Sequence, residues 1–301
     1  MKETRVTFYS EGEQIAGLLR QPDSGSGPHR GIVQGPGWMG LKDAKLYLPY
    51  HEALTAAGFA VLIFDYRGFG DSAGRTDLVI PGMQLEDLIN AVTYLGSRDD
   101  IDADNIGTFG SGGTGGGNAI VLSAADSRIG CAVSQVPVAD GADWLHRMRS
   151  EHEWLSFLER LEADRVTRVT TGEGEMVHPR EEIMVPTPER RATNVKGDVD
   201  SRTPTSVQLR SAEAIMEYKP IDVVGNVPNL MIIGVANDAV TPTDHAEALY
   251  QAAPGPKKLI IQHHTTHYAA YKQYGDEVIP QIVEWFDTHL QRGHLDVSQG
   301  G

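Results

Sequence analysis

The chain has 301 residues, of which 40% are hydrophobic and 22% are charged, the balance of a soluble globular protein with a large core. Its formal net charge of −15 argues against nucleic acid and against an anionic membrane surface as partners. The single cysteine, Cys131, excludes an intrachain disulfide framework. Because neither a signal peptide nor an apolar run of membrane-spanning length is recognisable, we expect a cytoplasmic protein.

Strand and helix patterns alternate along residues 1–138. A hairpin is expected first, then further strands and helices, with a turn at 102–105 before the fifth strand. The expected strands are 5–9, 15–20, 31–34, 60–64, 106–109 and 129–135, and the expected helices are 47–57 and 84–95. Continuous apolar strands separated by helices predict an α/β fold, with a mostly parallel central sheet covered by helices on both faces.

The composition changes over residues 139–218, which are charged and have few strand patterns. Strand and helix patterns then resume, as strands at 230–234 and 258–262 and helices at 244–253 and 278–290. We therefore interpret 139–218 as a lid or cap insertion in a core formed by 1–138 and 219–294. The last residues, 295–301, are expected to be a flexible tail.

A burst of glycines follows the strand at 106–109, in the stretch NIGTFGSGGTGGGNA (105–119). A strand, a tight glycine turn and a helix are the setting of a nucleophile elbow, which presents one side chain at the edge of a sheet. The same letters contain GxGxxG, but the dinucleotide fingerprint belongs in the first βα turn and needs an acid about 20 residues later, where this chain has Gly130. A Walker A loop is excluded, since Gly116 replaces its lysine. We predict no cofactor.

Two further candidate residues follow later strands. Asp238 comes after the strand at 230–234, and His267 comes after the strand at 258–262. Because the carboxyl ends of parallel strands meet at one edge of the sheet, we expect these side chains to be hydrogen-bonded. A histidine oriented by a carboxylate is the general base of a nucleophilic triad. The nearby histidine cluster HHTTH has no accompanying set of carboxylates or cysteines, so no metal site is predicted.

Together these motifs resemble the α/β-hydrolase superfamily, notably the cytosolic branch near dienelactone hydrolases and Xaa-Pro dipeptidyl-peptidase-like hydrolases. The resemblance covers about residues 4–292 and rests on GPGW (35–38), FDYRGFGDS (64–72), the glycine turn, QVP (135–137), ND and TP (237–242) and THY (266–268). It implies that Asp238 and His267 are the acid and base. It also implies that backbone N–H groups near Trp38 and Gly113 form the oxyanion hole, the donors that stabilise the negative oxygen formed during acyl transfer.

The sequence departs from this family at the nucleophile. The branch typically reads aromatic-Gly-x-Ser-x-x-Gly-Gly, and placing that pattern on residues 109–116 puts Gly112 where the serine belongs. Ser111 and Thr114 are the alternatives. Ser111 should point to the opposite side of the turn, and Thr114 needs two extra residues after the strand. An engineered change of serine to glycine would read the same way.

We therefore expect an enzyme that acts on a small carbonyl substrate (an ester, an amide or a C–C bond) through a His267–Asp238 dyad, at an elbow without the usual serine. Three alternatives stay open: an esterase or amidase that uses Ser111 or Thr114, a serine-less lyase, decarboxylase or isomerase, and a non-catalytic ligand-binding homologue. The expected partners are a small-molecule substrate and, as an option, further copies of the chain.

Overall fold

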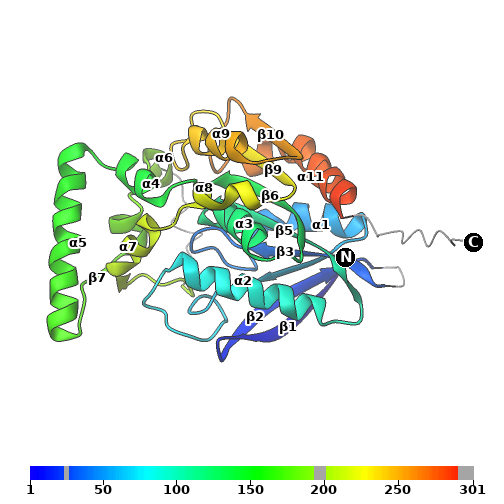
Figure 1. Cartoon of the computed structure of the whole chain (residues 1–301), viewed down its shortest axis with the longest axis horizontal. Helices are drawn as coiled ribbons and strands as arrows, with labels where there is room; N and C mark the ends of the chain where they lie inside the picture. The colour runs from blue at the N-terminus through cyan, green and yellow to red at the C-terminus, as the bar shows by residue number, and fades with distance from the viewer. Residues whose placement is uncertain (24–26, 193–200, 291–301) are drawn as a thin grey trace, which may run out of the picture.

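Eight strands form one sheet in the computed structural model, which describes residues 1–23, 27–192 and 201–290 (Figure 1). Their order across the sheet is β1-β2-β4-β3-β5-β6-β9-β10. The strands are β1 (Lys2–Ser10), β2 (Glu13–Gln21), β3 (His29–Gly35), β4 (Ala60–Phe64), β5 (Ile101–Gly113), β6 (Ile129–Pro137), β9 (Leu230–Val235) and β10 (Lys257–Gln262). Only the pairs β1–β2 and β2–β4 are antiparallel, and the other pairs in this sheet are parallel. The predicted α/β fold with a mostly parallel sheet is therefore confirmed.

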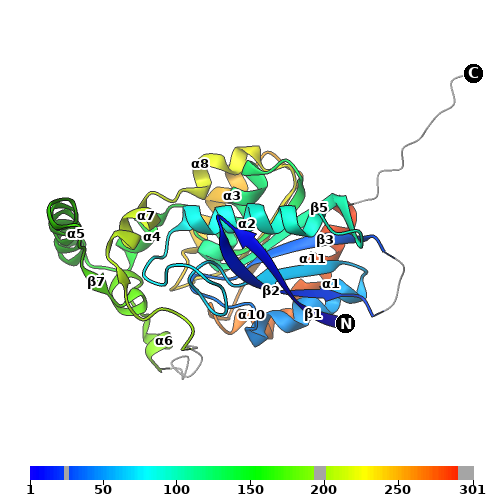
Figure 2. The same ribbon diagram turned by 90° about the horizontal axis from the view of Figure 1, so that it is seen from below.

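Helices cover both faces of this sheet, as Figure 2 shows with α1 and α11 on one side and α2, α3 and α8 on the other. The helices are α1 (Leu48–Ala56), α2 (Pro81–Gly96), α3 (Thr114–Ala125), α8 (Pro220–Val223), α9 (Thr243–Ala252), α10 (Ala270–Gln273) and α11 (Gly275–His289), with 3-10 turns η1 (Lys45–Tyr47) and η4 (Val224–Asn226). Because apolar helix faces lie on both sides, all five residues of β4 are buried.

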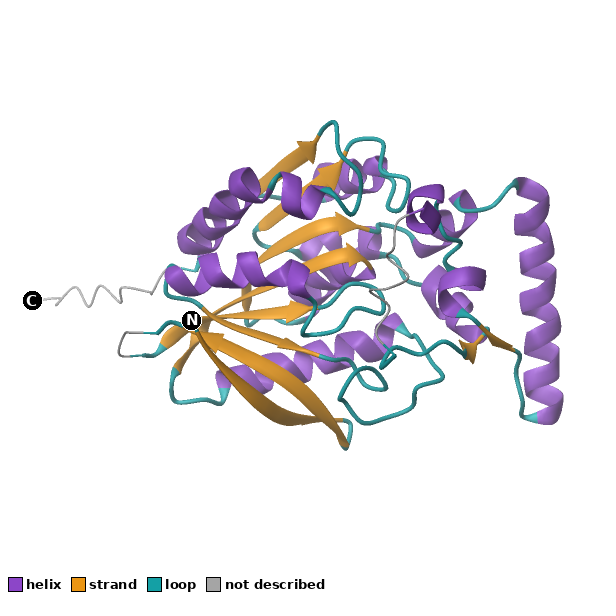
Figure 3. Ribbon diagram, turned by 180° about the vertical axis from the view of Figure 1, so that it is seen from behind, coloured by secondary structure: helices purple, strands orange, loops and turns teal. Residues whose placement is uncertain are grey.

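Residues 139–192 and 201–218, which lie between β6 and α8 in the chain and are here named the inserted segment, gather at one end of the sheet (Figures 1 and 3). The elements are α4 (Gly141–Arg147), α5 (Glu151–Thr171), β7 (Met176–Val177), the π-helical turn η2 (Pro179–Ile183), α6 (Pro188–Ala192), β8 (Val207–Gln208) and α7 (Arg210–Met216). A capping box of Ser150 and Glu153 starts α5, and Gly172 ends it at a φ of 84°. The tail expected at 295–301 lies outside the described residues.

Candidate active site

Strand β5 leads its glycines directly into helix α3, which begins at Thr114. The two residues at the turn, Gly112 and Gly113, have φ angles of 78° and 57°, a backbone conformation that glycine adopts at little cost. A Cβ atom on Gly115 would lie only 2.6 Å from the carbonyl oxygen of Pro36. The strand, glycine turn and helix expected around residues 105–119 are present, with the strand running on to Gly113 and the helix beginning at Thr114; we call residues 109–116 the elbow. Close packing of helix against loop explains the glycine at position 115.

Gly112 and Gly113 differ from their neighbours because they have room for a side chain. A Cβ atom on Gly112 would lie no closer than 3.4 Å to any other group, with the hydroxyl of Tyr271 at 3.7 Å. On Gly113 the nearest atoms would be the Trp144 ring at 3.5 Å and the Thr241 methyl at 3.9 Å. Both glycines line a cavity. The fold thus provides space for a nucleophilic side chain at the turn, and the sequence places none there.

The two flanking hydroxyls are poorly placed to act as that nucleophile. Ser111 lines the cavity, but its Oγ atom is buried and makes no hydrogen bond of ordinary geometry. This hydroxyl lies close enough to those of Tyr47 and Tyr271 to lower the pKa of each phenol, against the larger raising effect of burial. Thr114 is completely buried and is not among the described residues that line the cavity. Neither hydroxyl occupies the turn itself.

Asp238 and His267 meet at the carboxyl edge of the sheet. Asp238 follows β9 and His267 follows the neighbouring strand β10. Nδ1 of His267 lies 2.8 Å from Oδ2 of Asp238, so the predicted hydrogen bond is present. His267 also lines the same cavity as the two turn glycines. The structure therefore brings Asp238, His267 and the two turn glycines together at one site.

Backbone and hydroxyl donors hold the Asp238 carboxylate in place. Its Oδ1 accepts from the N–H groups of Val240 and Thr241, at 2.7 and 3.1 Å, and its Oδ2 accepts from the Thr241 hydroxyl at 3.0 Å. Burial opposes ionisation, but the bond to His267, its charge and the two N–H groups outweigh burial and lower the pKa of Asp238 below its ordinary value. An ionised Asp238 fixes the His267 proton on Nδ1, which leaves Nε2 as the basic atom.

The loop after β3 contacts the elbow through its backbone. The N–H of Trp38 donates to the carbonyl oxygen of Gly112 at 3.3 Å, and the N–H of Gly37 donates to the Tyr47 hydroxyl at 3.0 Å. The N–H of Trp38, which was predicted to be an oxyanion donor, therefore already donates to a carbonyl oxygen of the elbow. The first N–H groups of α3, next to Gly113, have no partner within their own helix and face the turn. They are the better-placed donors for a developing negative charge.

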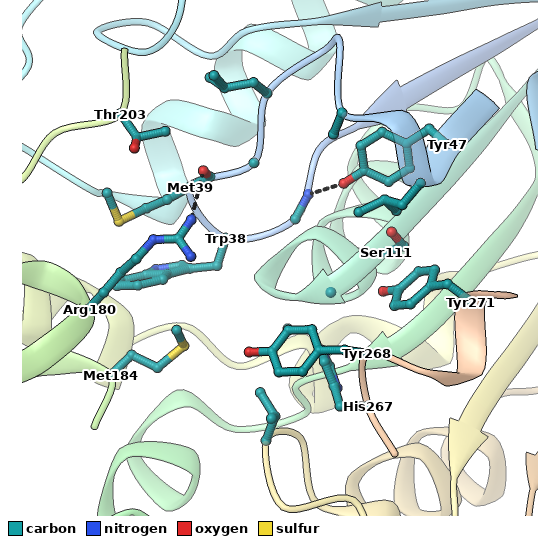
Figure 4. Close-up of a pocket in the computed structure, with 18 of the residues that line it drawn as sticks. Trp38, Met39, Tyr47, Ser111, Arg180, Met184, Thr203, His267, Tyr268 and Tyr271 are labelled. Carbon is teal, nitrogen blue, oxygen red and sulfur yellow. Dashed lines mark hydrogen bonds between the residues drawn. The ribbon is translucent and has the colours of Figure 1, made fainter. Parts of the chain in front are cut away.

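The cavity has a volume of about 590 Å³, which suits a small molecule (Figure 4). Besides the elbow and His267, its wall includes Trp38, Met39, Tyr47, Trp144, Arg180 and Tyr271. The rings of Trp38 and Trp144 meet edge to face, and the indole N–H of Trp144 donates to the carbonyl of Val240 at 2.7 Å. Arg180, from the inserted segment, donates to the carbonyl of Met39 at 3.1 Å. Core and inserted segment therefore build this wall together.

Several wall residues were not predicted from the sequence, among them Tyr47, Arg180 and Tyr271. Tyr271 alone had a usable signal, because a residue four positions after His267 lies on the same face if the chain turns helically there. The chain does turn helically, since the N–H of Ala270 donates to the carbonyl of Thr266. Tyr47 and Arg180 reach the cavity through tertiary contacts that local patterns do not show.

Within the described ranges no group of three His, Cys, Asp or Glu side chains is arranged to hold a metal ion. In the same part of the chain, no helix combines the length and the apolar character that crossing a membrane requires.

A mostly parallel sheet with an elbow after β5, an acid after β9 and a histidine after β10 defines an α/β-hydrolase. Solved structures agree on the fold: that of DcsB in complex with its substrate analogue superposes with a TM-score of 0.81 at 21% identity, over 96% of this chain and 99% of that one. Residues 12–269 match the X-Pro dipeptidyl-peptidase (S15 family), and the chain belongs to this family.

Two curated relatives extend the comparison. An uncharacterised 31.7 kDa protein of the traX-finO intergenic region in Escherichia coli is 31% identical over 95% of this chain and all of its own length. The acyltransferase drtE of Aspergillus calidoustus is 25% identical over 85% of this chain and 86% of its own. The chain is thus a member of a hydrolase family with the α/β-hydrolase fold.

Proposed function

We propose that this protein hydrolyses small esters or thioesters with His267 as a general base that activates water, without a covalent acyl-enzyme. The observation that supports this is the His267–Asp238 hydrogen bond of 2.8 Å at a cavity whose elbow has space for a side chain and no hydroxyl at that space. The acyltransferase relative favours an acyl substrate, because acyl transfer also begins with attack on an acyl carbonyl. We take the inserted segment to be a lid, since Trp144 and Arg180 come from it.

We place the tip of the elbow at Gly113, one residue after the position that the family pattern assigns. Gly113 is the last residue before α3 and has φ 57° and ψ −110°, outside the regions that other residues favour. A Cβ atom there would lie 3.5 Å from the Trp144 ring and 3.9 Å from the methyl group of Thr241, the residue whose hydroxyl lies 3.4 Å from Nδ1 of His267. A Cβ atom on Gly112 would instead lie 3.4 Å from the Cα atom of Gly37 and 3.7 Å from the Tyr271 hydroxyl.

The proposed reaction needs no group beyond this site and water. Nε2 of His267 takes a proton from water as the water oxygen attacks the acyl carbon, and the carbonyl electrons move to its oxygen. The first N–H groups of α3 stabilise that negative oxygen. The carbonyl then re-forms, the bond to the alcohol or thiol breaks, and His267 returns its proton to the leaving group. Asp238 stays ionised and stabilises the histidinium.

Thiol release from a panel of short-chain acyl thioesters tests this proposal. We expect His267→Gln to abolish turnover, while the control His264→Gln, which changes an exposed neighbour, leaves it unchanged. Intact-mass spectrometry during turnover should find no acyl adduct on the native protein. Turnover that survives His267→Gln would refute the role of the dyad, and an adduct on Ser111 or Thr114 would show an ordinary covalent esterase.

A further inference from the structure

Tyr271 belongs to the same short helical turn as His267. The N–H of Ala270 donates to the carbonyl of Thr266 at 3.0 Å, so the chain is helical between them, and residues four apart lie on one face. The two rings are 6.4 Å apart between centroids, at an angle of 73°. Ala270 is buried in a small apolar cluster with Val136 and Val235. The scaffold that fixes His267 therefore fixes Tyr271 as well.

The Tyr271 hydroxyl points at the space beside Gly112, next to the proposed tip at Gly113. It lies 3.7 Å from the position that a Cβ atom on Gly112 would take, and Figure 4 shows it directed towards the turn between Ser111 and His267. The Tyr50 hydroxyl donates to the Tyr271 backbone carbonyl at 3.4 Å. Burial raises the pKa of Tyr271 well above its ordinary value, so the phenol stays neutral and protonated.

The Ser111 hydroxyl lies beside the buried side of this phenol. Its Oγ atom is buried, lies next to the hydroxyls of Tyr47 and Tyr271, and has lone pairs to accept from either. The Tyr47 oxygen already accepts from the N–H of Gly37, so its own O–H is free to turn towards Ser111. When the O–H of Tyr271 turns towards Ser111, the phenol oxygen presents lone pairs to the cavity.

We propose that Tyr271 is a second catalytic residue, which holds the attacking water between its phenol oxygen and Nε2 of His267, in the space above Gly112 and Gly113. The water donates one hydrogen to each of these acceptors and turns its own lone pairs towards the substrate carbonyl. Its proton goes to His267, and Tyr271 neither gains nor loses a proton. A serine oxygen is held in place by its bond to the protein chain. In this site two hydrogen bonds would hold the attacking water oxygen instead. This inference rests on the proposed function and adds a residue to it.

Tyr271→Phe in the full-length protein tests the inference, with the same thioester panel as the assay. Loss of one contact on the water should lower kcat about 10- to 100-fold and leave KM within about twofold, because only the reacting water is affected. The matched control is Tyr274→Phe, which removes a phenol of the same segment whose hydroxyl donates to the carbonyl of His263. We expect that control to behave as the native protein.

Hydroxylamine distinguishes a role of Tyr271 in positioning water from a purely structural role. As a strong external nucleophile it depends less on a positioned water, so hydroxamate formation should fall less than hydrolysis in Tyr271→Phe. A serine placed at Gly113 needs no positioned water. Labelling by a fluorophosphonate should therefore be equal in Gly113→Ser/Tyr271→Phe and in Gly113→Ser. Equal kcat for Tyr271→Phe and native protein would overturn this inference only. Absence of any His267-dependent turnover would overturn the proposed function, and this inference with it.

Discussion

Placing a serine at Gly113 should convert the site into a covalent one. The added Cβ atom would have ordinary van der Waals neighbours, at 3.5 Å from Trp144 and 3.9 Å from Thr241, so the change costs backbone strain rather than a clash. A residue with a Cβ atom at a φ of 57° and a ψ of −110° costs about 1–3 kcal/mol. With an unfolding entropy of about 2.1 cal/mol/K per residue over 301 residues, that strain lowers Tm by roughly 2–5 °C. The new hydroxyl would lie within reach of His267, and we expect stoichiometric labelling by a fluorophosphonate, followed by mapping of the labelled peptide.

Four further variants make this experiment decisive. Gly113→Ala carries the same strain without a hydroxyl and should remain unlabelled, and so should Gly113→Ser/His267→Gln, because its serine lacks a base. In Gly115→Ser, the Cβ atom would lie 2.6 Å from the Pro36 carbonyl oxygen, and we expect a severe loss of stability. Labelling of Gly112→Ser but not of Gly113→Ser would move the tip back to Gly112. Labelling of the native protein on Ser111 or Thr114 would refute the idea of a serine-less elbow.

Other expectations follow from the same geometry. Asp238→Asn should reduce kcat/KM by orders of magnitude, because the amide no longer fixes the tautomer of His267. Since the pKa of Asp238 is lowered, its contribution to stability is present above the ordinary carboxyl range and is lost as pH falls through the lowered value; below about pH 4 the free energy of unfolding should fall more steeply for the native protein than for Asp238→Asn. Thr114→Ala should leave turnover unchanged, because that side chain is buried away from the cavity wall, as the same assay would show. Calorimetric titration should find no saturable binding of NAD, NADP or nucleoside triphosphates, since the glycines serve the close packing of α3: Cβ atoms on Gly115 and Gly116 would each lie 2.6 Å from a carbonyl oxygen, of Pro36 and Gln135.

The sheet could be predicted because buried parallel strands are continuous apolar runs, as in residues 60–64, which form β4 with the same limits. The start of β5 could not be predicted from the sequence. Residues 102–105 suggest a turn by their charges and Asn105, yet Asp102 pairs with Arg30 at the beginning of β3, before a register shift in the ladder. Backbone pairing with a distant strand overrides the local preference there.

The dyad was predictable because a fixed topology brings the ends of neighbouring strands to one edge. The tip of the elbow was not, because the choice between Gly112 and Gly113 depends on φ angles and on where α3 begins, and a run of glycines has no side chains that would reveal either. For Tyr47 and Arg180 the deciding contacts are tertiary: one phenol oxygen accepts from the N–H of Gly37, and one guanidinium donates to the carbonyl of Met39.

The space for a side chain at Gly113 also determines which single-base mutations the fold tolerates there. Where glycine is encoded by GGT or GGC, a single base change gives AGT or AGC, which encode serine. Steric clash at this position does not bar that change, whereas at Gly115 the same base change would put an atom against the Pro36 carbonyl. On the proposed function, a single base change would therefore separate acyl chemistry through a bound water from acyl chemistry through a covalent intermediate on the same scaffold. Directed evolution that starts from this chain can sample both from a single round of point mutagenesis.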